Sequence, residues 1–290
     1  MSSNRFAMSA EEYLADQNVL HYLEDSISQL MMHREDNPKV NPAKFLQDYF
    51  VSIQQGNHTL FREYNFIRAT PHNRASFIRT FWKCFRHIGK NGDLLNVQEY
   101  HSLLCLLCPN FPPELVQQTA RIIFMEDAMD SLTSFPDFLY AFQVQFYYEE
   151  FLQVCSDTYD RLLSSVQSPR EAVYIPSETS PRQQEKKQQP RPSEQAMPEG
   201  VDARQFLEAL GKECLDAKYS NPPAPCLSEL LTGAQRVSFY GFLMGLAKSQ
   251  SVNASIGSLP AKGALYEDPD PKLTSAVTKV RASSAIREDR

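Results

Sequence analysis

Apolar residues in the first 55 positions recur at spacings of three and four, and this pattern constrains the fold more than any other feature. Such spacing places the side chains on one side of an α-helix. Because proline cannot continue a helix, Pro38 separates two stripes. The sequence therefore predicts one helix over about 13–33 and a second that starts at Pro42, with Asn41 as its N-cap and Gly56 as its C-terminal stop. The first stripe comprises Leu14, Val19, Leu20, Leu23, Ile27, Leu30 and Met31, and the second comprises Phe45, Leu46, Tyr49, Phe50 and Ile53.

Two helices of this length cannot hide their apolar faces alone, because soluble monomers rarely expose patches above a few hundred Å². Two such hairpins packed face to face form a four-helix bundle and bury both patches. We therefore predict self-association or pairing with a similar hairpin. An ordinary helical hairpin packed on the rest of the chain is the alternative. The expected interface residues are Leu14, Leu20, Leu23, Ile27, Leu30, Phe45, Leu46, Tyr49, Phe50 and Ile53.

The run from Tyr13-Leu14 to Leu46-Gln47-Asp48-Tyr49-Phe50 resembles the dimerisation-docking hairpin of the protein kinase A regulatory subunits and the Dpy-30 proteins. In that family the dimer forms a shallow apolar groove for an amphipathic partner helix, and the resemblance implies the same arrangement here. The segment between the helices, residues 34–41, is longer than in that family.

Residues 77–167 predict four further helices separated by short loops. They are expected over about 77–88, from Asn96 with Glu99 closing a capping box, over about 113–129, and from Ser134 as far as Leu163. This order of helices and loops resembles a pair of EF-hands.

Calcium requires oxygen ligands at fixed loop positions. In the first loop these positions fall on Ile88, Lys90 and Gly92; in the second they fall on Glu126, Ala128 and Asp130, with Ser131 where glycine is expected. We therefore expect a degenerate EF-hand-like region without metal. A weak calcium site in the second loop and an unrelated helical bundle are the alternatives.

The segment 62–90 carries basic side chains with aromatic residues between them. A surface of this kind can bind an acidic partner or nucleic acid, whereas the simpler interpretation is a solvated helix face. The net charge of −6 opposes binding to nucleic acid. The candidate residues for an acidic-partner patch are Arg62, Arg68, Arg74, Arg79, Lys83, Arg86 and Lys90.

No catalytic motif is present: the chain lacks a P-loop, G-x-G-x-x-G, H-E-x-x-H and G-x-S-x-G. Cys105 and Cys108 have zinc-ligand spacing, but no second such pair accompanies them, so they are expected in the core. We therefore expect no catalytic residues, no metal and no cofactor. No signal peptide and no membrane span are expected either, so the cysteines indicate a reducing, cytosolic setting.

Six prolines among polar residues mark 168–199 as a disordered linker. Helical periodicity returns over 200–265, where Phe206, Leu210 and Phe242 lie in apolar stripes and Ser238 is an expected N-cap. Residues 266–290 are expected to form a disordered tail. The predicted fold is therefore all-α, with a dimerisation-docking-type hairpin over 11–56, an EF-hand-like region over 57–167 and a C-terminal helical segment after the linker.

Five runs together resemble the family of centriolar satellite-associated regulators of the tubulin polyglutamylase complex. They are Leu60-Phe61-Arg62-Glu63-Tyr64, Ala69-Thr70-Pro71-His72-Asn73-Arg74, Gly89-Lys90-Asn91-Gly92-Asp93-Leu94-Leu95, Gln143-Val144-Gln145-Phe146-Tyr147-Tyr148 and Phe239-Tyr240-Gly241-Phe242-Leu243-Met244. The resemblance implies a non-catalytic adaptor that helps localise the complex at centriolar satellites, and so influences tubulin polyglutamylation and microtubule organisation.

The same resemblance implies a setting in the cytoplasm, on the cytoskeleton and at the centrosome. Its implied partners are the other subunits of the complex, including a tubulin-tyrosine-ligase-like ligase, together with centriolar satellite proteins and tubulin. Two alternative functions follow from the residues: a calcium-responsive EF-hand-like sensor, and a direct microtubule-binding protein that uses the basic segment 62–90.

Overall fold

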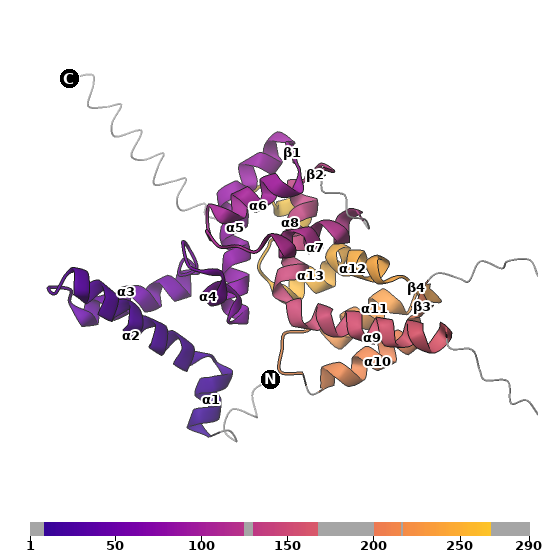
Figure 1. The fold of residues 1–290 in the computed structure, drawn as a ribbon, viewed down its shortest axis with the longest axis horizontal. Coiled ribbons are helices and arrows are strands. Elements are labelled where there is room, and N and C mark those ends of the chain that lie inside the picture. The colour runs from indigo at the N-terminus through magenta and orange to yellow at the C-terminus, as the bar shows by residue number, and fades with distance from the viewer. Residues whose placement is uncertain (1–8, 125–129, 168–199, 216, 268–290) are drawn as a thin grey trace, which may run out of the picture. The chain divides into compact units, whose positions relative to one another are not determined.

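The computed structural model describes residues 9–124, 130–167, 200–215 and 217–267 (Figure 1). Within these ranges it contains thirteen α-helices and two short antiparallel sheets. The predicted all-α class is thus confirmed. The chain divides into two compact units. Unit 1 comprises Met1–Phe111, Asp130–Leu139 and Gly257–Arg290, and unit 2 comprises Pro112–Met129 and Tyr140–Ile256.

Unit 1 is built around buried aromatic rings. The rings of Tyr100 and Phe138 stack with centroids 3.9 Å apart, and Phe77 stacks on Phe111 at 5.7 Å. The elements of this unit are α1 (Ala10–Asp16), α2 (Val19–Asp36), α3 (Pro42–Gln55), α4 (Tyr64–Arg68), α5 (Pro71–Asn91), β1 (Leu94–Leu95), α6 (Val97–Cys105), β2 (Thr133–Ser134), the first residues of α8 (Phe135–Tyr147) and a 3₁₀ turn (Lys262–Ala264).

Unit 2 has a core of its own, in which Phe151, Phe206 and Leu246 are fully buried. The ring of Phe206 meets that of Phe242 edge-on at 5.1 Å. Besides the remainder of α8, its elements are α7 (Pro113–Phe124), α9 (Glu149–Gln167), β3 (Val201–Asp202), α10 (Ala203–Leu215), α11 (Ala224–Leu231), β4 (Arg236–Val237), α12 (Phe239–Lys248) and α13 (Gln250–Ile256).

Each short strand leads directly into a helix, and all four of these helices begin with the same kind of N-cap. A polar side chain at the strand end accepts the backbone N–H three residues later, which satisfies one of the free donors of the first helical turn. β1 pairs with β2, and β3 pairs with β4, both antiparallel. Among the residues that the structure describes, the order helix–strand–helix therefore occurs four times, in two pairs. The capping residues are Asn96, Ser134, Asp202 and Ser238.

Several predicted caps are confirmed. Asn41 caps α3 with Pro42 as its first residue, Gly56 ends it in the left-handed conformation, and Asn96 forms the capping box with Glu99. The prediction of one helix over 13–33 was wrong. Asn18 takes a positive φ of 54° and separates α1 from α2, and asparagine tolerates this conformation better than most residues do.

Two other predicted helices differ from the structure in their limits. The helix expected over 77–88 begins six residues earlier, at Pro71, because Thr70 caps it. The helix expected from Ser134 to Leu163 is divided into α8 and α9 at Tyr148. Two further helices, α4 and α13, were not predicted. The predicted linker 168–199, the end of the helix expected over 113–129, and most of the predicted tail lie outside the described residues.

Candidate partner-binding site

Helices α2 and α3 form an antiparallel hairpin within unit 1 (Figure 1). The side of α2 that faces the rest of unit 1 is polar. Tyr22 is 8% exposed and Ser26 is fully buried, whereas the stripe of apolar residues on the same helix is open to solvent. The usual distribution of polar and apolar side chains is therefore reversed on α2.

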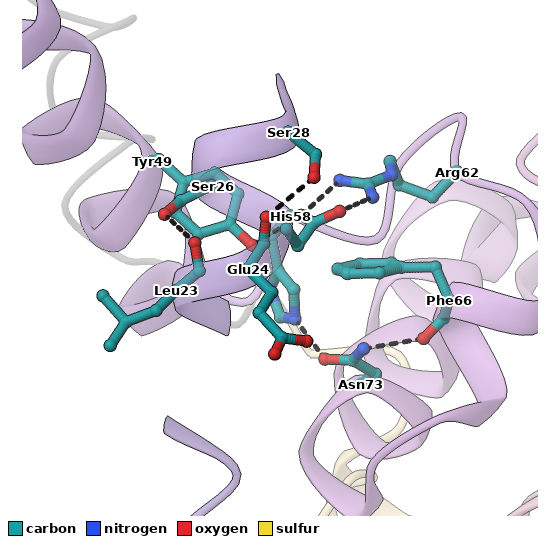
Figure 2. Close-up of polar contacts among 10 residues, drawn as sticks. Leu23, Glu24, Ser26, Ser28, Tyr49, His58, Arg62, Phe66 and Asn73 are labelled. Carbon is teal, nitrogen blue, oxygen red and sulfur yellow. Dashed lines mark hydrogen bonds and ion pairs between the residues drawn. The ribbon is translucent and has the colours of Figure 1, made fainter. Parts of the chain in front are cut away.

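The first set of contacts that holds the hairpin in place centres on Asn73 of α5. The hydroxyl of Tyr22 donates to Asn73 Oδ1 at 2.7 Å, and Nε2 of His58 lies 2.8 Å from the same oxygen (Figure 2 shows the His58 contact). Because Oδ1 can only accept, His58 carries its proton on Nε2. The Asn73 amide in turn donates to the carbonyl of Phe66 at 2.7 Å.

The second set centres on Asp25 of α2. Its carboxylate forms a two-bonded ion pair with Arg62 and accepts a hydrogen bond of 2.6 Å from the hydroxyl of Tyr49 on α3. Figure 2 shows the guanidinium of Arg62 beside the ring of Phe66, and its Cζ lies over this ring, 3.7 Å from the ring centroid. Asp25 therefore ties α2 both to α3 and to the segment that leads into α4. We call the contacts of Asp25, Tyr22 and His58 the polar seam.

Burial and charge shift the pKa values of the groups in the polar seam. Burial alone would raise the pKa of Asp25, but the hydrogen bonds from Arg62 and Tyr49 outweigh it and hold that pKa below its usual value. Burial lowers the pKa of His58, although its bond to Asn73 opposes this. Both shifts favour the arrangement in which Asp25 is charged and His58 is neutral near pH 7.

The outer face of α2 carries exposed apolar side chains at spacings of three and four, so they form one stripe along the helix. We call these residues the outer stripe. Their exposed fractions are 45% for Leu20, 38% for Leu23, 56% for Ile27 and 57% for Met31. Scattered exposed apolar residues are normal, but a continuous stripe on one helix indicates a surface that another molecule covers.

The structure divides the ten predicted interface residues into three groups. Leu20, Leu23 and Ile27 are exposed on the outer stripe. Tyr49 is buried and bonded to Asp25, so it belongs to the polar seam. The half-buried residues are Leu14, Leu30, Phe45, Leu46, Phe50 and Ile53. The polar residues Tyr22, Asp25 and Asn73 were not predicted, because the spacing of apolar residues along a helix carries no information about polar contacts.

A cavity of about 220 Å³ lies beside Tyr49, and most of the residues that line it carry polar groups. Gln29, Asp48 and Ser52 contribute to it, together with the rings of His33 and Phe45. An apolar helix face would leave these polar groups without hydrogen bonds. The outer stripe is therefore better suited than this cavity to receive an apolar partner.

The predicted basic segment is likewise divided. Arg62 belongs to the polar seam, the guanidinium of Arg68 lies 5.7 Å from the ring centre of Tyr64, and Arg74 is buried with its Nε donating to the carbonyl of Arg68. Only the part from Arg79 onward, along α5, presents a run of basic side chains at the surface of unit 1.

The parts of the chain that the structure describes contain neither a cluster of metal ligands nor a membrane-spanning helix. There, no three or more His, Cys, Asp or Glu side chains lie close enough to hold a metal ion. Cys105 instead contacts His101, with Sγ 3.5 Å from Nε2, and burial raises the pKa of Cys108 to about 11. No helix in the described ranges combines the length and hydropathy that crossing a bilayer requires.

Comparison with known proteins gives one consistent result. The family model of the CSTPP1 N-terminal domain matches residues 7–56, which contain the α1–α3 segment. Relatives named centriolar satellite-associated tubulin polyglutamylase complex regulator 1 match almost the whole chain. The relative from Pongo abelii is 50% identical over 282 residues, which cover 97% of this chain and 84% of the relative. The relative from Homo sapiens is 49% identical with the same coverage, and that from Danio rerio is 48% identical over 98% of this chain and 85% of its own. No solved structure matches.

Proposed function

This chain belongs to the family of the centriolar satellite-associated tubulin polyglutamylase complex regulators, and from that premise we propose that it acts as a non-catalytic adaptor of the complex. In this proposal the chain works at centriolar satellites, in the cytoplasm and on the cytoskeleton. The ligase chemistry belongs to a tubulin-tyrosine-ligase-like partner. The chain contributes binding surfaces that help to localise the complex and so influences tubulin polyglutamylation and microtubule organisation.

The observation that carries the adaptor proposal is the reversed α2 helix. Its polar side is used up by the hydrogen bonds of Tyr22 and Asp25 within unit 1, and its apolar side remains at the surface. Full burial of a large aliphatic side chain stabilises by about 1.5–3 kcal/mol. Because the four residues of the outer stripe are each about half exposed, a partner that covers them gains roughly 3–5 kcal/mol.

We propose that this partner is a second helical hairpin, either from another copy of this chain or from another subunit of the complex. Two helices of a partner hairpin packed against α2 and α3 would form a four-helix bundle, in which apolar stripes of this width meet. The half-buried residues Leu30, Phe50 and Ile53 supply further apolar surface on the same hairpin.

The test is a full-length chain with Leu23→Glu and Ile27→Glu. These charges should abolish capture of the polyglutamylase subunits in a co-purification, because a carboxylate cannot enter an apolar interface without a large desolvation cost. Ser28→Glu is the control: it adds one carboxylate to an exposed position of α2, outside the stripe, and each single variant of the stripe is compared with it. Light scattering of the purified chain shows whether the lost contact is with a second copy.

Circular dichroism must show equal helix content for the variant and its control. Should the double variant retain both self-association and the full set of subunits, the outer stripe is not the binding surface and the adaptor proposal loses its structural support.

A further inference from the structure

The C-terminal half of α5 carries a second surface with a different chemistry. Its basic side chains recur at spacings of four, three and four residues, so they lie on one side of the helix. We call them, together with His87 between the last two, the basic stripe. Its members are Arg79, Lys83, Arg86, His87 and Lys90.

The basic side chains that precede this stripe, those of Arg62, Arg68 and Arg74, contact other residues of unit 1. Two members of the stripe form no such ion pair in the part of the chain that the structure describes. Lys83 and Lys90 are exposed and form no ion pair with any residue in the described ranges. One cation in the last helical turn is explained by the negative end of the helix dipole, and Lys90 meets that need. Lys83 lies about two turns earlier, so the dipole does not account for it.

The stripe is not a flat surface. Arg86, His87 and Lys90 line a cavity of about 110 Å³ together with Tyr266. The phenol of Tyr266 comes so close to α5 that a Cβ on Gly89 would lie 2.9 Å from its oxygen, so glycine makes this approach feasible. Two further contacts fix the segment that carries Tyr266: Trp82 Nε1 donates to the carbonyl of Leu265 at 2.8 Å, and Arg86 donates to that of Glu267.

We propose that the basic stripe binds an extended, acidic peptide segment of a partner protein. The rise of 1.5 Å per residue places successive cations of the stripe about 4–6 Å apart along α5, over a length of roughly 16 Å. In an extended peptide, every second side chain lies on the same face, about 6.6 Å further along. A run of about five or six acidic residues therefore matches the stripe in length, and about three of its side chains lie on the face that meets the cations.

Charge favours this class of partner over others. The whole chain carries a net charge of −6, so an acidic peptide is repelled by most of the molecule and attracted at the stripe. Lysine and arginine side chains on one helix face bind carboxylates through charge-assisted hydrogen bonds. The proposal does not depend on the hairpin, so the two surfaces can be tested separately.

Fluorescence anisotropy of a labelled hexaglutamate peptide with the full-length chain tests the proposal. We expect saturable binding at low salt that weakens as salt is raised, and no binding of hexaglutamine of the same length. Lys83→Gln with Lys90→Gln should raise the dissociation constant about tenfold, since two of the charged contacts are lost. Lys212→Gln with Lys248→Gln removes the same charge from exposed lysines of unit 2 and should leave the affinity unchanged.

Equal binding of hexaglutamine, equal loss in both lysine pairs, or absence of hexaglutamate binding at low salt would each overturn the proposal. Thermal melts of both double variants show whether a loss of binding comes from unfolding.

Discussion

Replacing Asp25 with asparagine should detach the α2–α3 hairpin from the rest of unit 1. Asparagine keeps the size of the side chain but removes the charge that Arg62 pairs with and the strong acceptor for the Tyr49 hydroxyl. The side chains of Asp25 and Arg62 are only 14% and 21% exposed, so solvent screens the pair weakly. A hydrogen bond to a charged group contributes about 1.5–3 kcal/mol, and the variant also leaves Arg62 without a counter-charge.

Taken together, these losses should weaken the attachment of the hairpin by about 2–4 kcal/mol. Since 1.4 kcal/mol is a factor of ten, the backbone amides of α2 that face the polar seam should exchange with deuterium roughly 30 to 1,000 times faster. Hydrogen exchange followed by mass spectrometry measures this directly. Glu24→Gln is the control, because Glu24 is an exposed carboxylate next to Asp25 on the same helix.

The measurement belongs near pH 7. The folded-state pKa of Asp25 lies below its ordinary value of 3.8, so its contribution to stability is fully present above about pH 4. The contribution is lost only as pH falls through that lower folded-state value. If exchange in α2 is the same for Asp25→Asn and for the Glu24→Gln control, the polar seam does not hold the hairpin and our account of the reversed helix is wrong.

Three further predictions concern pH, backbone geometry and metal. Burial lowers the folded-state pKa of His58 below 6.5, so the free energy of unfolding should fall as pH drops below about 6.5, and urea titrations should show a smaller fall for His58→Gln. Gly200 has a φ of 99°, and a Cβ there would lie 2.3 Å from the carbonyl oxygen of Val237. Gly200→Ala should therefore destabilise unit 2 by more than about 2 kcal/mol in thermal melts. Gly211 lies in an open position of α10, so Gly211→Ala should stabilise unit 2 by about 0.5–1 kcal/mol in the same melts. Isothermal titration with millimolar calcium should give no binding heat. The first predicted loop offers no carboxylate at its early ligand positions, and the second has Ala128 at one of them and Ser131 where glycine is expected; a saturable heat would contradict this.

The helix pattern was largely predictable, because it depends on neighbours a few residues apart. Asn41, Asn96 and Ser238 cap their helices as the local sequence indicates, and Gly56 ends α3. The break between α8 and α9 was not predictable in this way. No glycine or proline lies near Tyr148, and the continuous aromatic pattern across it favours one long helix.

The two strand pairs were missed for a similar reason. Each strand has only two residues, which is too short for the alternation that marks a strand in a sequence. The signal that could have found them is the polar cap at the end of each strand or directly after it, such as Asp202, the last residue of β3. The domain limits predicted from composition and the EF-hand-like character of residues 57–167 stay predictions.

The candidate site was half predictable. Periodicity placed Leu23 and Ile27 on one face of a helix, but it could not show which face the rest of the chain would cover. That choice depends on the contact between Tyr22 and Asn73, which are 51 residues apart in the sequence. Contacts between residues so far apart in the sequence leave no trace in the local spacing of apolar residues. The polar residues that make them look, in the sequence, like an ordinary solvent-exposed helix face.

The reversed helix also explains how one hairpin can be fixed to its own chain and still be available to another. Had the apolar stripe of α2 packed on unit 1, the same hydrophobic gain would have held the hairpin and no apolar surface would remain for a partner. Hydrogen bonds and an ion pair hold it instead, through Asp25 and Tyr22. They contribute less net stability than apolar burial of similar extent, because water competes for each group. The outer stripe at Leu23 and Ile27 thereby stays exposed, and this exposure is the physical basis for a second molecule binding there.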